Sequence, residues 1–396
     1  MGSGLLYVQA AQRLGLQPIT FSDDPTLYDH FGAKGAETIR VDTDDLDTLI
    51  RECSRLQETY EIAGITGALD PVYATVGKLC RHFDLPGPNP DAVEQCCDKY
   101  TQRQLLAASG VPMPAYRLAT NAAEVEDSAA ELGLPVIVKP AVGSNSEGVQ
   151  LCRTADELAQ HTNYLLGGQH IWRSAPRMLV EEFAQGPGYG VDTMGNEVVG
   201  ISVSHGGPPP RFVHGYEIHP APLTEDKHQR ITDISLSCLR ALGLGWGPAG
   251  IEIRWTKRGP VVIEVNPRLH GSPAPQMVRL AYGVDLITAH IKLAIGEEWD
   301  LRKRHSQAVA ARYLVADRGG TLDWISGDSE AAAVPGVVEV KCYGPIPRPI
   351  FRRGDDLDYL GHVIAASSSP AQTEEIVMRA ASLINWSITP FRIKDE

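Results

Sequence analysis

The stretch GIEIRWTKRGPVVIEVNPR, residues 250–268, carries two glutamates within otherwise apolar runs. These runs flank the polar residues TKRG, which predicts an antiparallel hairpin. A loop of three residues, 257–259, would let Gly259 take the left-handed position that such a turn needs. A loop one residue longer would instead put the glutamates on opposite faces. The three-residue loop predicts the pairs 256 with 260, 254 with 262, and 252 with 264.

The glutamates of this hairpin would then face each other, with Cβ atoms about 4.5–5.5 Å apart. Facing carboxylates repel, so one must take up a proton or a cation must lie between them. Mg²⁺ prefers oxygen ligands, and the amide of Asn266 lies on the same face as Glu264. The alternative is an exposed sheet face with two unrelated glutamates. The spacing predicts a metal site of Glu252, Glu264 and Asn266, with Arg268 bringing positive charge to its edge.

A second polar segment is LPVIVKPAVGSNSEGVQL, residues 134–151, which reads as strand, glycine-rich turn and strand. Backbone N–H groups and hydroxyls in such a turn can approach an anion closely, and Lys139 adds a positive charge. The order differs from that of P-loop NTPases, because the lysine precedes the glycines. An anion site and a flexible hairpin with a solvated lysine both fit this pattern.

The elements that must position these residues follow from apolar periodicity. A helix over 5–15, a strand over 17–22, a helix over 46–60 and the apolar run 62–69 alternate, which predicts a parallel sheet with helices on its faces. The chain starts inside a helix, so either the first strand is lost or the start has been placed too far downstream. Further expected elements are helices over 91–110, 226–243 and 272–296, and strands over 176–183, 309–316 and 337–344.

The composition of the chain excludes some classes of protein. The 396 residues carry a formal net charge of −13, which argues against a nucleic-acid-binding protein, since that needs a clustered basic face. Seven scattered cysteines favour a reducing compartment over a disulfide framework. Neither a bilayer-spanning apolar run nor a signal peptide is evident, so we expect a cytoplasmic protein without a membrane partner.

Taken together, the motifs resemble the ATP-grasp superfamily of carboxylate–amine ligases. The C-terminal hundred residues and EVNPRLHG resemble most closely the L-amino acid ligases, which join unprotected amino acids into dipeptides. The resemblance covers nearly the whole chain and implies an ATP-grasp fold of α/β and α+β class. It divides the chain into a Rossmann-like pre-ATP-grasp domain (1–92, its first strand absent), an N-terminal lobe with the lid (93–186), a C-terminal lobe with the metal site (187–300) and an α+β subdomain (301–396). The motifs occur in the expected order: the DK of CCDKYTQRQLLAASG, then PVIVKPAVGSNSEGV, MLVEEF, GIEIRW and EVNPRLHG.

The resemblance also implies roles for individual residues. Lys99 and Lys139 would hold the ATP phosphates under a lid formed by 143–148. Arg268 would stabilise the acyl phosphate and the tetrahedral intermediate. Glu217 and His219 are candidates for contacting the amino-acid substrate, although His219 and His270 fit a structural role equally well. The remaining implied contacts are the lid residues Gly143, Ser144, Ser146 and Gly148, the adenine-binding residues Glu181, Glu182, Phe183 and Ala184, and the ligands Glu252, Glu264 and Asn266 of two Mg²⁺ (or Mn²⁺) ions.

The implied reaction joins an amino-acid carboxylate to an amine through an acyl phosphate and releases ADP and phosphate. Its partners would be small-molecule amino or carboxylic acids, and the resemblance allows a homodimer. A bicarbonate-activating carboxylase and a nucleotide-binding protein that has lost catalysis are the alternatives. One departure bears on nucleotide binding: Gly188 stands where related ligases carry a ribose-contacting glutamate.

Overall fold

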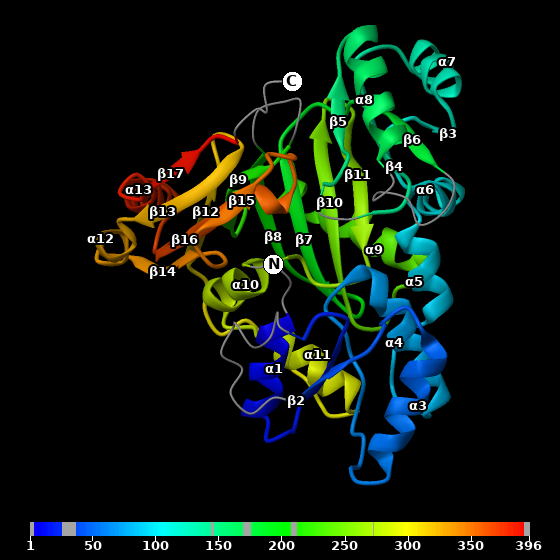
Figure 1. Cartoon of the computed structure of the whole chain (residues 1–396), viewed down its shortest axis with the longest axis vertical. Coiled ribbons are helices and arrows are strands. Elements are labelled where there is room, and N and C mark those ends of the chain that lie inside the picture. The colour runs from blue at the N-terminus through cyan, green and yellow to red at the C-terminus, as the bar shows by residue number, and fades with distance from the viewer. Residues whose placement is uncertain are drawn as a thin grey trace.

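The computed structural model describes residues 4–25, 37–143, 146–168, 176–206, 212–271 and 273–391. A twisted central sheet dominates the molecule, with an α/β lobe above it and the N-terminal elements below it in Figure 1. Its eight strands run in the order β11-β10-β7-β8-β9-β12-β16-β14. Their bounds are β7 Gly188–Met194, β8 Glu197–Gly206, β9 His214–His219, β10 Pro248–Thr256, β11 Gly259–Asn266, β12 Ala308–Val315, β14 Val337–Cys342 and β16 Tyr359–Ser367.

Helices cover both faces of this sheet. Helix α9, Glu225–Leu242, packs on β8, β10 and β11, with the predicted helix 226–243 confirmed. The predicted helix over 272–296 is instead two helices, α10 (Ala274–Tyr282) and α11 (Leu286–Ala294). Gly283 ends α10 in a left-handed conformation with φ 72°, which breaks the run. Helix α10 packs on β9, β12 and β16.

The α/β lobe contains the predicted strand–turn–strand unit. Its antiparallel sheet has the order β3-β6-β4-β5, and its apolar core is shared with two helices. The predicted strand over 176–183 is confirmed as β6. The bounds are β3 Tyr116–Ala119, α7 Ala122–Leu132, β4 Val136–Pro140, β5 Gln150–Cys152, α8 Ala155–Gly167 and β6 Met178–Glu182.

The predicted helix over 91–110 is wrong in one respect that matters for the site. It divides into α5 (Pro90–Cys97) and α6 (Lys99–Ala108). Asp98 between them is extended, with φ −89° and ψ 105°, and its carboxylate accepts a hydrogen bond from the Thr101 N–H at 2.8 Å. This N-cap makes Lys99 the first residue of α6, where its N–H donates to the Ala141 carbonyl at 2.7 Å. The break therefore brings Lys99 to the end of β4.

The N-terminal part contains the predicted helices and only part of the predicted sheet. Strands β1 and β2 pair in parallel as a two-stranded sheet. The apolar run 62–69 forms no strand, so the expected alternation fails there. The bounds are α1 Gly4–Arg13, β1 Ile19–Ser22, β2 Glu37–Arg40, α3 Leu46–Gln57 and α4 Asp70–His82.

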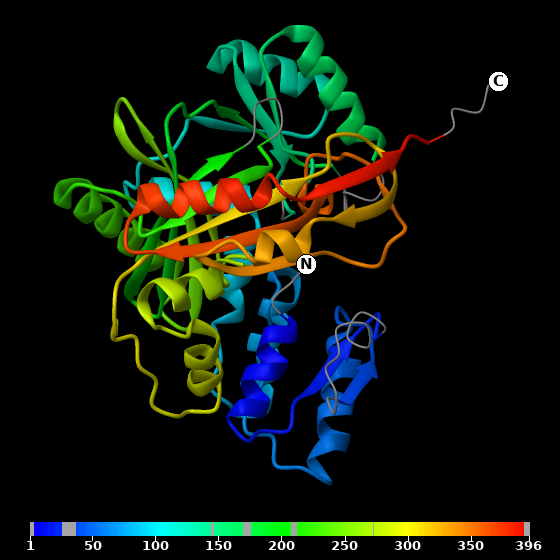
Figure 2. The same cartoon turned by 90° about the vertical axis from the view of Figure 1, so that its left-hand side faces the viewer.

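The C-terminal part extends the central sheet through β12, β16 and β14, which include the predicted strands 309–316 and 337–344. In Figure 2 helix α13 lies across these strands, in agreement with its contacts to β12 and β16. One sheet contains strands from both sides of residue 300, since β9 pairs with β12. The predicted boundary between a C-terminal lobe and an α+β subdomain at this residue therefore stays a prediction. Among the described helices, none combines the length and apolarity needed to cross a bilayer. The remaining bounds are β13 Gly320–Ser326, α12 Asp328–Ala332, β15 Arg348–Ile350, a 3₁₀ turn Asp356–Asp358, α13 Pro370–Ala381 and β17 Asn385–Thr389.

Candidate active site

The β10–β11 hairpin brings its two glutamates together as predicted, but with a shorter turn and a β-bulge. Glu252 pairs directly with Glu264, so this prediction is confirmed. The predicted three-residue loop is wrong, because Thr256 pairs with Gly259 and Arg254 with Val261. The register shifts after Glu252, where Ile263 is the additional residue of a β-bulge. The tighter turn and the bulge cancel, and the glutamates regain the same face.

Helix α6 supports the bulge. The guanidinium of Arg103 donates to the Ile263 carbonyl, which the bulge removes from the regular ladder. The amide of Gln102 donates to the Val265 carbonyl at 2.8 Å and accepts from the Val265 N–H at 3.0 Å. An edge strand leaves such backbone groups open, and α6 satisfies them here. The position of Glu264 therefore depends on a helix about 160 residues earlier in the chain.

The face that carries the glutamates presents oxygen atoms of the kind that Mg²⁺ binds. Glu252 and Glu264 lie opposite each other, and Asn266, 8% exposed, follows on the same face. No group of three or more His, Cys, Asp or Glu side chains that could hold a metal occurs in the part of the chain that the structure describes. Two carboxylates with an amide nevertheless fit Mg²⁺, which commonly binds one or two protein carboxylates together with substrate phosphates.

Lys99 lies at this face because the break at Asp98 makes it the first residue of α6. Its Nζ is 3.0 Å from Glu264 Oε1 and donates to the Gly143 carbonyl of the predicted lid. Burial disfavours the ammonium, but Glu264 outweighs burial and raises the pKa of Lys99. Burial likewise opposes the charge of Glu264, yet Lys99 and Lys139 lower the pKa of its carboxyl. Both groups are therefore charged near neutral pH.

Lys139 belongs to a buried ionic network with Arg103 and Glu181. Its Nζ lies 2.5 Å from Glu181 Oε2, and Arg103 Nε lies 2.7 Å from Glu181 Oε1. All three residues are at most 3% exposed. Burial lowers the pKa of Lys139, and Glu181 offsets part of that effect. The resemblance gave the Glu181 side chain to adenine, whereas the structure pairs both its oxygens with cations.

This network predicts a large stability effect at Arg103. Arg103→Ala should lower the free energy of unfolding by about 3–5 kcal/mol, because Glu181 and the Ile263 carbonyl lose a buried partner. Chemical denaturation followed by far-UV circular dichroism measures this. The control is Arg117→Ala, whose ion pair with Glu131 is exposed and should cost less than about 1 kcal/mol. Equal losses for the two variants would contradict the assigned role of the network.

The same network predicts acid sensitivity. Burial raises the pKa of Glu181, but Arg103 and Lys139 outweigh it, so the folded pKa lies below the ordinary 4.5. The unfolded chain thus binds the proton first as the pH falls. The stabilisation is present above pH 4.5 and is lost as the pH falls through the folded pKa. Urea titrations between about pH 6 and pH 3 should show a shallower decline for Glu181→Gln than for wild type, and parallel declines would refute the prediction.

Strand β6 supplies Glu181 to this network, and the lid follows Lys139 of β4 in the chain. Glu182 accepts two hydrogen bonds from Arg258, at 2.7 and 2.8 Å, which tie the α/β lobe to the hairpin turn. Phe183 stacks on Phe212 with ring centroids 6.1 Å apart, and Ala184 is buried. Of the lid residues, Gly143, Ser146 and Gly148 connect β4 to β5, and Ser144 lies outside the described residues.

Arg254 is a partly buried cation close enough to Glu252 to feel its charge, and sequence reasoning missed it. It lies two residues beyond Glu252 in β10 and donates to the Gly186 carbonyl at 2.9 Å. A Cβ on Gly188 would lie 3.7 Å from its Cζ atom. The position where related ligases carry glutamate therefore adjoins a guanidinium in this chain.

Arg268 is held by a residue that the sequence did not single out. Its Nε donates to Asp70 Oδ2 at 2.6 Å, and both side chains are about one-eighth exposed, at 13% and 12%. A further N–H of the guanidinium donates to the Leu269 carbonyl at 2.9 Å. Asp70 is the first residue of α4, so the N-terminal part of the chain supplies one wall of the site.

A cluster of buried polar side chains extends the same sheet face toward β9. Asp192 pairs with Gly250 across the β7–β10 ladder, and Gly250 pairs with Asn266, which places Asp192 in line with the predicted metal ligands. Asp192 accepts a hydrogen bond from His270 Nδ1 at 3.0 Å and is 1% exposed. Burial lowers the pKa of His270, but Asp192 outweighs it and the net shift is upward. A charged residue inside the buried strand GYGVDTM was the available sequence signal.

Glu217 and His219 complete this cluster. His219 Nε2 lies 3.2 Å from Glu217 Oε1, and the Tyr313 hydroxyl donates to Glu217 at 3.4 Å. Within the described residues, Asp192 Oδ2, His219 Nδ1 and His270 Nε2 are buried atoms without a hydrogen-bond partner. Glu217 and His219, the two predicted substrate residues, thus lie in a cluster with buried polar atoms that still need a hydrogen-bond partner.

Three glycines of the central sheet leave space for side chains that pack directly against its backbone. A Cβ at Gly250 would lie 2.8 Å from the His270 ring, and one at Gly200 would lie 2.9 Å from Tyr282. A Cβ at Gly190, which pairs with Glu252, would lie 2.8 Å from Ser202 Oγ. Only residues without a side chain let these groups lie directly on the sheet.

Comparisons with known proteins agree with the fold and with the order of motifs. Residues 96–272 match the ATP-grasp domain family, and residues 312–389 match L-amino acid ligase C-terminal domain 2. The chain is 57% identical over 389 residues to uncharacterized protein y4rH of Sinorhizobium fredii, covering 98% of this chain and 81% of that protein. It is 28% identical over 319 residues to carnosine synthase 1 of Mus musculus, covering 73% of this chain but only 38% of the synthase.

Solved structures show the same architecture. The L-amino acid ligase from Bacillus licheniformis superposes with a TM-score of 0.82 at 21% identity, covering 97% of this chain and 95% of that one. The biotin carboxylase domain of the 2-oxoglutarate carboxylase from Hydrogenobacter thermophilus, a dimer in complex with MgADP, gives 0.72 at 18% identity, covering 98% and 89%. These likenesses establish the fold. The two family matches show that the chain belongs to the ATP-grasp superfamily of carboxylate–amine ligases and carries an L-amino acid ligase C-terminal domain.

Proposed function

We propose that this protein ligates the carboxylate of an amino acid to an amine, with ATP cleaved to ADP and phosphate. The observation that carries the proposal is the arrangement on one sheet face: Glu252, Glu264 and Asn266 adjoin two buried lysines on one side and the Asp192 cluster on the other. The phosphate end and the amino-acid end of such a reaction would then meet between them, near Arg268.

Lys99 and Lys139 would hold the phosphates of ATP. Each is buried and now faces a carboxylate, Glu264 or Glu181. A bound triphosphate gives these ammonium groups further negative partners at the mouth of the same site. Two Mg²⁺ ions, or Mn²⁺, bound by Glu252, Glu264 and Asn266 would supply charge neutralisation across the phosphate oxygens.

In the first step, a carboxylate oxygen of the amino acid attacks the γ-phosphorus and ADP leaves, which forms an acyl phosphate. In the second, an uncharged amine attacks the acyl carbon, its nitrogen loses a proton, and phosphate leaves. Arg268, which Asp70 holds in place, would stabilise the oxyanion of the tetrahedral intermediate. The lid over 143–148 would exclude water from the acyl phosphate.

The Asp192 cluster would bind the α-ammonium group of the amino acid that is activated. Among the described residues Asp192 Oδ2 is a buried acceptor without a hydrogen-bond partner, although His219 Nε2 lies 4.0 Å away, and Glu217 adds a second carboxylate beside His219. An ammonium group supplies the donors and the charge that these acceptors need. The same negative charge disfavours bicarbonate, an anion without a cationic end, and so weighs against the carboxylase alternative.

The test is a phosphate-release screen with ATP, Mg²⁺ and amino acids in pairs, with mass spectrometry of the products. We expect ADP and a mass-confirmed amide. Formation of AMP and pyrophosphate would refute the acyl-phosphate route. Phosphate release that requires bicarbonate and no amino acid would favour a carboxylase, and ATP binding without turnover of any pair would favour a protein that has lost catalysis. Gel filtration with light scattering tests whether the chain forms the homodimer that the resemblance allows.

A variant of Asp192 tests the ammonium site. Asp192→Asn should reduce the preference for an amino acid over its des-amino analogue, measured as the ratio of kcat/KM values, by about 10- to 100-fold. The control is Asp233→Asn on the exposed side of α9, which should leave the ratio unchanged. A preserved ratio in Asp192→Asn with an equal loss for both substrates would contradict substrate binding at this cluster.

A further inference from the structure

The proposed reaction brings a substrate carboxylate to a sheet face that already carries several carboxylates. Glu252 faces Glu264 on the neighbouring strand, and Asp192 lies in line with them. Like charges repel, so a further carboxylate binds here only where a cation or a hydrogen-bond donor meets it. A donor close to Asp192 would hold that carboxylate while Asp192 holds the ammonium group of the same amino acid.

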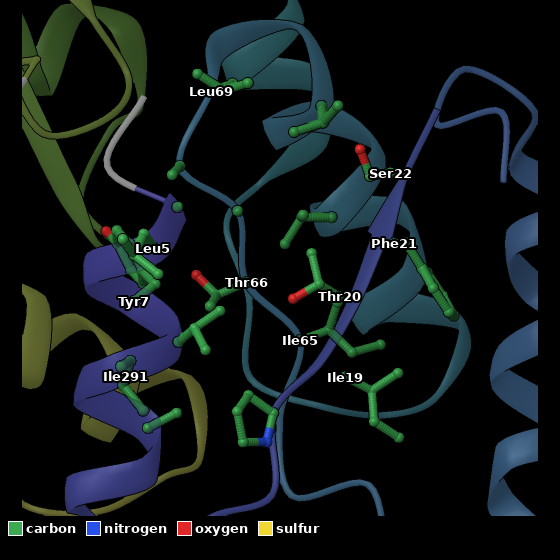
Figure 3. Close-up of a pocket in the computed structure, with 18 of the residues that line it drawn as sticks. Leu5, Tyr7, Ile19, Thr20, Phe21, Ser22, Ile65, Thr66, Leu69 and Ile291 are labelled. Carbon is green, nitrogen blue, oxygen red and sulfur yellow. The ribbon is translucent and has the colours of Figure 1, made fainter. Parts of the chain in front are cut away.

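A cavity of 1140 Å³ among the N-terminal elements does not suit such a substrate. Among the described residues that line it, none belongs to the predicted site. The residues labelled in Figure 3 carry aliphatic, aromatic or hydroxyl side chains, and none of these is charged near neutral pH. A charged group that entered between them would lose its hydration without gaining an ionic partner from them. The charged groups that fit an amino acid lie on the sheet face instead.

His270 lies on this face with one ring nitrogen fixed. Its Nδ1 lies 3.0 Å from Asp192 Oδ1, and an ionised carboxylate only accepts hydrogen bonds, so Nδ1 carries a proton. That bond orients the ring and turns Nε2 away from Asp192. Within the described residues Nε2 is a buried atom without a hydrogen-bond partner. Buried polar atoms are normally paired, so this nitrogen indicates a place where a further group binds.

Nε2 of His270 lies over two glycines that adjoin Glu252 in the sheet. A Cβ at Gly250 would lie 2.8 Å from Nε2, and a Cβ at Gly190 would lie 3.9 Å from it. Gly190 pairs with Glu252 across the ladder, and Gly250 precedes Glu252 by two residues on the same face. The ring therefore contacts Asp192 on one side and presents its other nitrogen beside a predicted metal ligand.

The groups around the His270 ring favour its charged form. Burial lowers the pKa of His270, but the hydrogen bond to Asp192 outweighs burial, and the charges of Glu252 and Glu217 add to the upward shift. An imidazolium carries a proton on each nitrogen, so Nε2 is then a donor. A charged donor binds a carboxylate more strongly than a neutral donor does.

The other buried histidine of the cluster lies farther from the metal ligands. His219 belongs to β9, and β7 and β8 separate that strand from β10, which carries Glu252. Its Nε2 lies 3.2 Å from Glu217, and its Nδ1 would lie 3.7 Å from a Cβ at Gly200. Of these two histidines, His270 is thus the one whose open nitrogen lies beside the place where the carboxylate would be activated.

We propose that His270 Nε2–H donates to one oxygen of the substrate carboxylate, so that Asp192 and His270 together bind a free amino acid by both of its charged ends. This inference rests on the proposed function. The other carboxylate oxygen attacks the γ-phosphorus, a new oxygen–phosphorus bond forms, and the bond to ADP breaks. His270 keeps its proton throughout and holds the carboxylate in the orientation for attack.

The test measures formation of the acyl phosphate apart from formation of the amide. Hydroxylamine converts an acyl phosphate to a hydroxamate, so ATP, Mg²⁺, hydroxylamine and one amino acid that wild type accepts report the first step alone. His270→Asn keeps an amide near the Nδ1 position to bind Asp192 but lacks Nε2. We expect it to lower kcat/KM for the amino acid by about 10- to 100-fold, with ATP affinity unchanged.

Two further variants identify the donor as the cause. His270→Gln places an amide N–H near the Nε2 position, so it should recover part of the loss seen in His270→Asn. The matched control is His228→Gln on the exposed side of α9, which should keep wild-type hydroxamate formation. Thermal melting of all the variants shows that they are folded, and titration with a non-hydrolysable ATP analogue gives their nucleotide affinity.

Failure of this inference and failure of the proposed function give different results. Hydroxamate formation that is equal in wild type and His270→Asn would overturn the role of His270 and leave the proposed reaction intact. Equal losses in His270→Asn and His270→Gln would also overturn it, because they would show that the ring matters and the Nε2 donor does not. Wild type that forms no hydroxamate from any amino acid would overturn the proposed reaction, and the role of His270 with it.

Discussion

Glu264→Gln should abolish ATP-dependent ligation, by about 10³-fold or more, while the protein stays folded. The amide keeps the shape of the side chain but removes the charge that faces Glu252 and that would bind the proposed metal ion. Lys99, now 3.0 Å from Glu264, would lose its partner at the same time. Phosphate release at saturating ATP, measured as a function of Mg²⁺ concentration, gives the loss and shows whether excess metal restores any activity.

The control for this variant is Glu131→Gln on α7, which removes one carboxylate from an exposed ion pair. It should keep wild-type turnover. Far-UV circular dichroism and thermal melting should show all three proteins folded. A neutral amide is a poor replacement for a charged metal ligand. Turnover of Glu264→Gln within about threefold of wild type would therefore show that the charge of Glu264 is not required for catalysis.

Arg268→Ala should lower kcat by about 10²- to 10³-fold with little change in ATP affinity. The side chain contacts Asp70 and the Leu269 carbonyl, and among the described residues no other hydrogen bond takes up its remaining donors, which could therefore reach a developing oxyanion. Isothermal titration with a non-hydrolysable ATP analogue separates nucleotide binding from turnover. Wild-type kcat in Arg268→Ala would contradict the proposed role.

Asp70 acts through Arg268, so it is a positioning residue, and its variant discriminates between structure and catalysis. Asp70→Asn should lower kcat less than Arg268→Ala does, and without a large change in KM. The double variant Asp70→Asn with Arg268→Ala should regain stability relative to Arg268→Ala, since no buried carboxylate is left unpaired. It should regain no activity. Recovery of turnover in the double variant would assign Arg268 to the fold instead of the reaction.

The β10–β11 hairpin shows how far local reasoning extends. Strand alternation and the polar turn predicted a hairpin with Glu252 opposite Glu264, and the pair forms. The loop length was wrong by one residue, and the bulge at Ile263 compensates. No local pattern signals that bulge, because its carbonyl is satisfied by Arg103 from another part of the chain.

Helix boundaries show the same limit. Apolar periodicity predicted one helix over 91–110, because the residues around Asp98 continue the helical pattern. The Asp98 carboxylate instead caps a new helix, and the Ala141 carbonyl takes up the Lys99 N–H. An aspartate is compatible with both arrangements, so only the contact with β4 decides between them.

The sequence alone determined the family, the order of its motifs and the face on which the predicted metal ligands lie. These depend on alternation, turn chemistry and residue type, which act over a few neighbouring residues. Tertiary structure decided which groups surround them. Asp70 meets Arg268 across 198 residues, and Asp192 joins Asn266 only through Gly250 on the strand between them. A charged residue far away in the chain carries no local sign of its partner, because ion pairs and sheet neighbours are fixed by packing of the whole fold and not by periodicity.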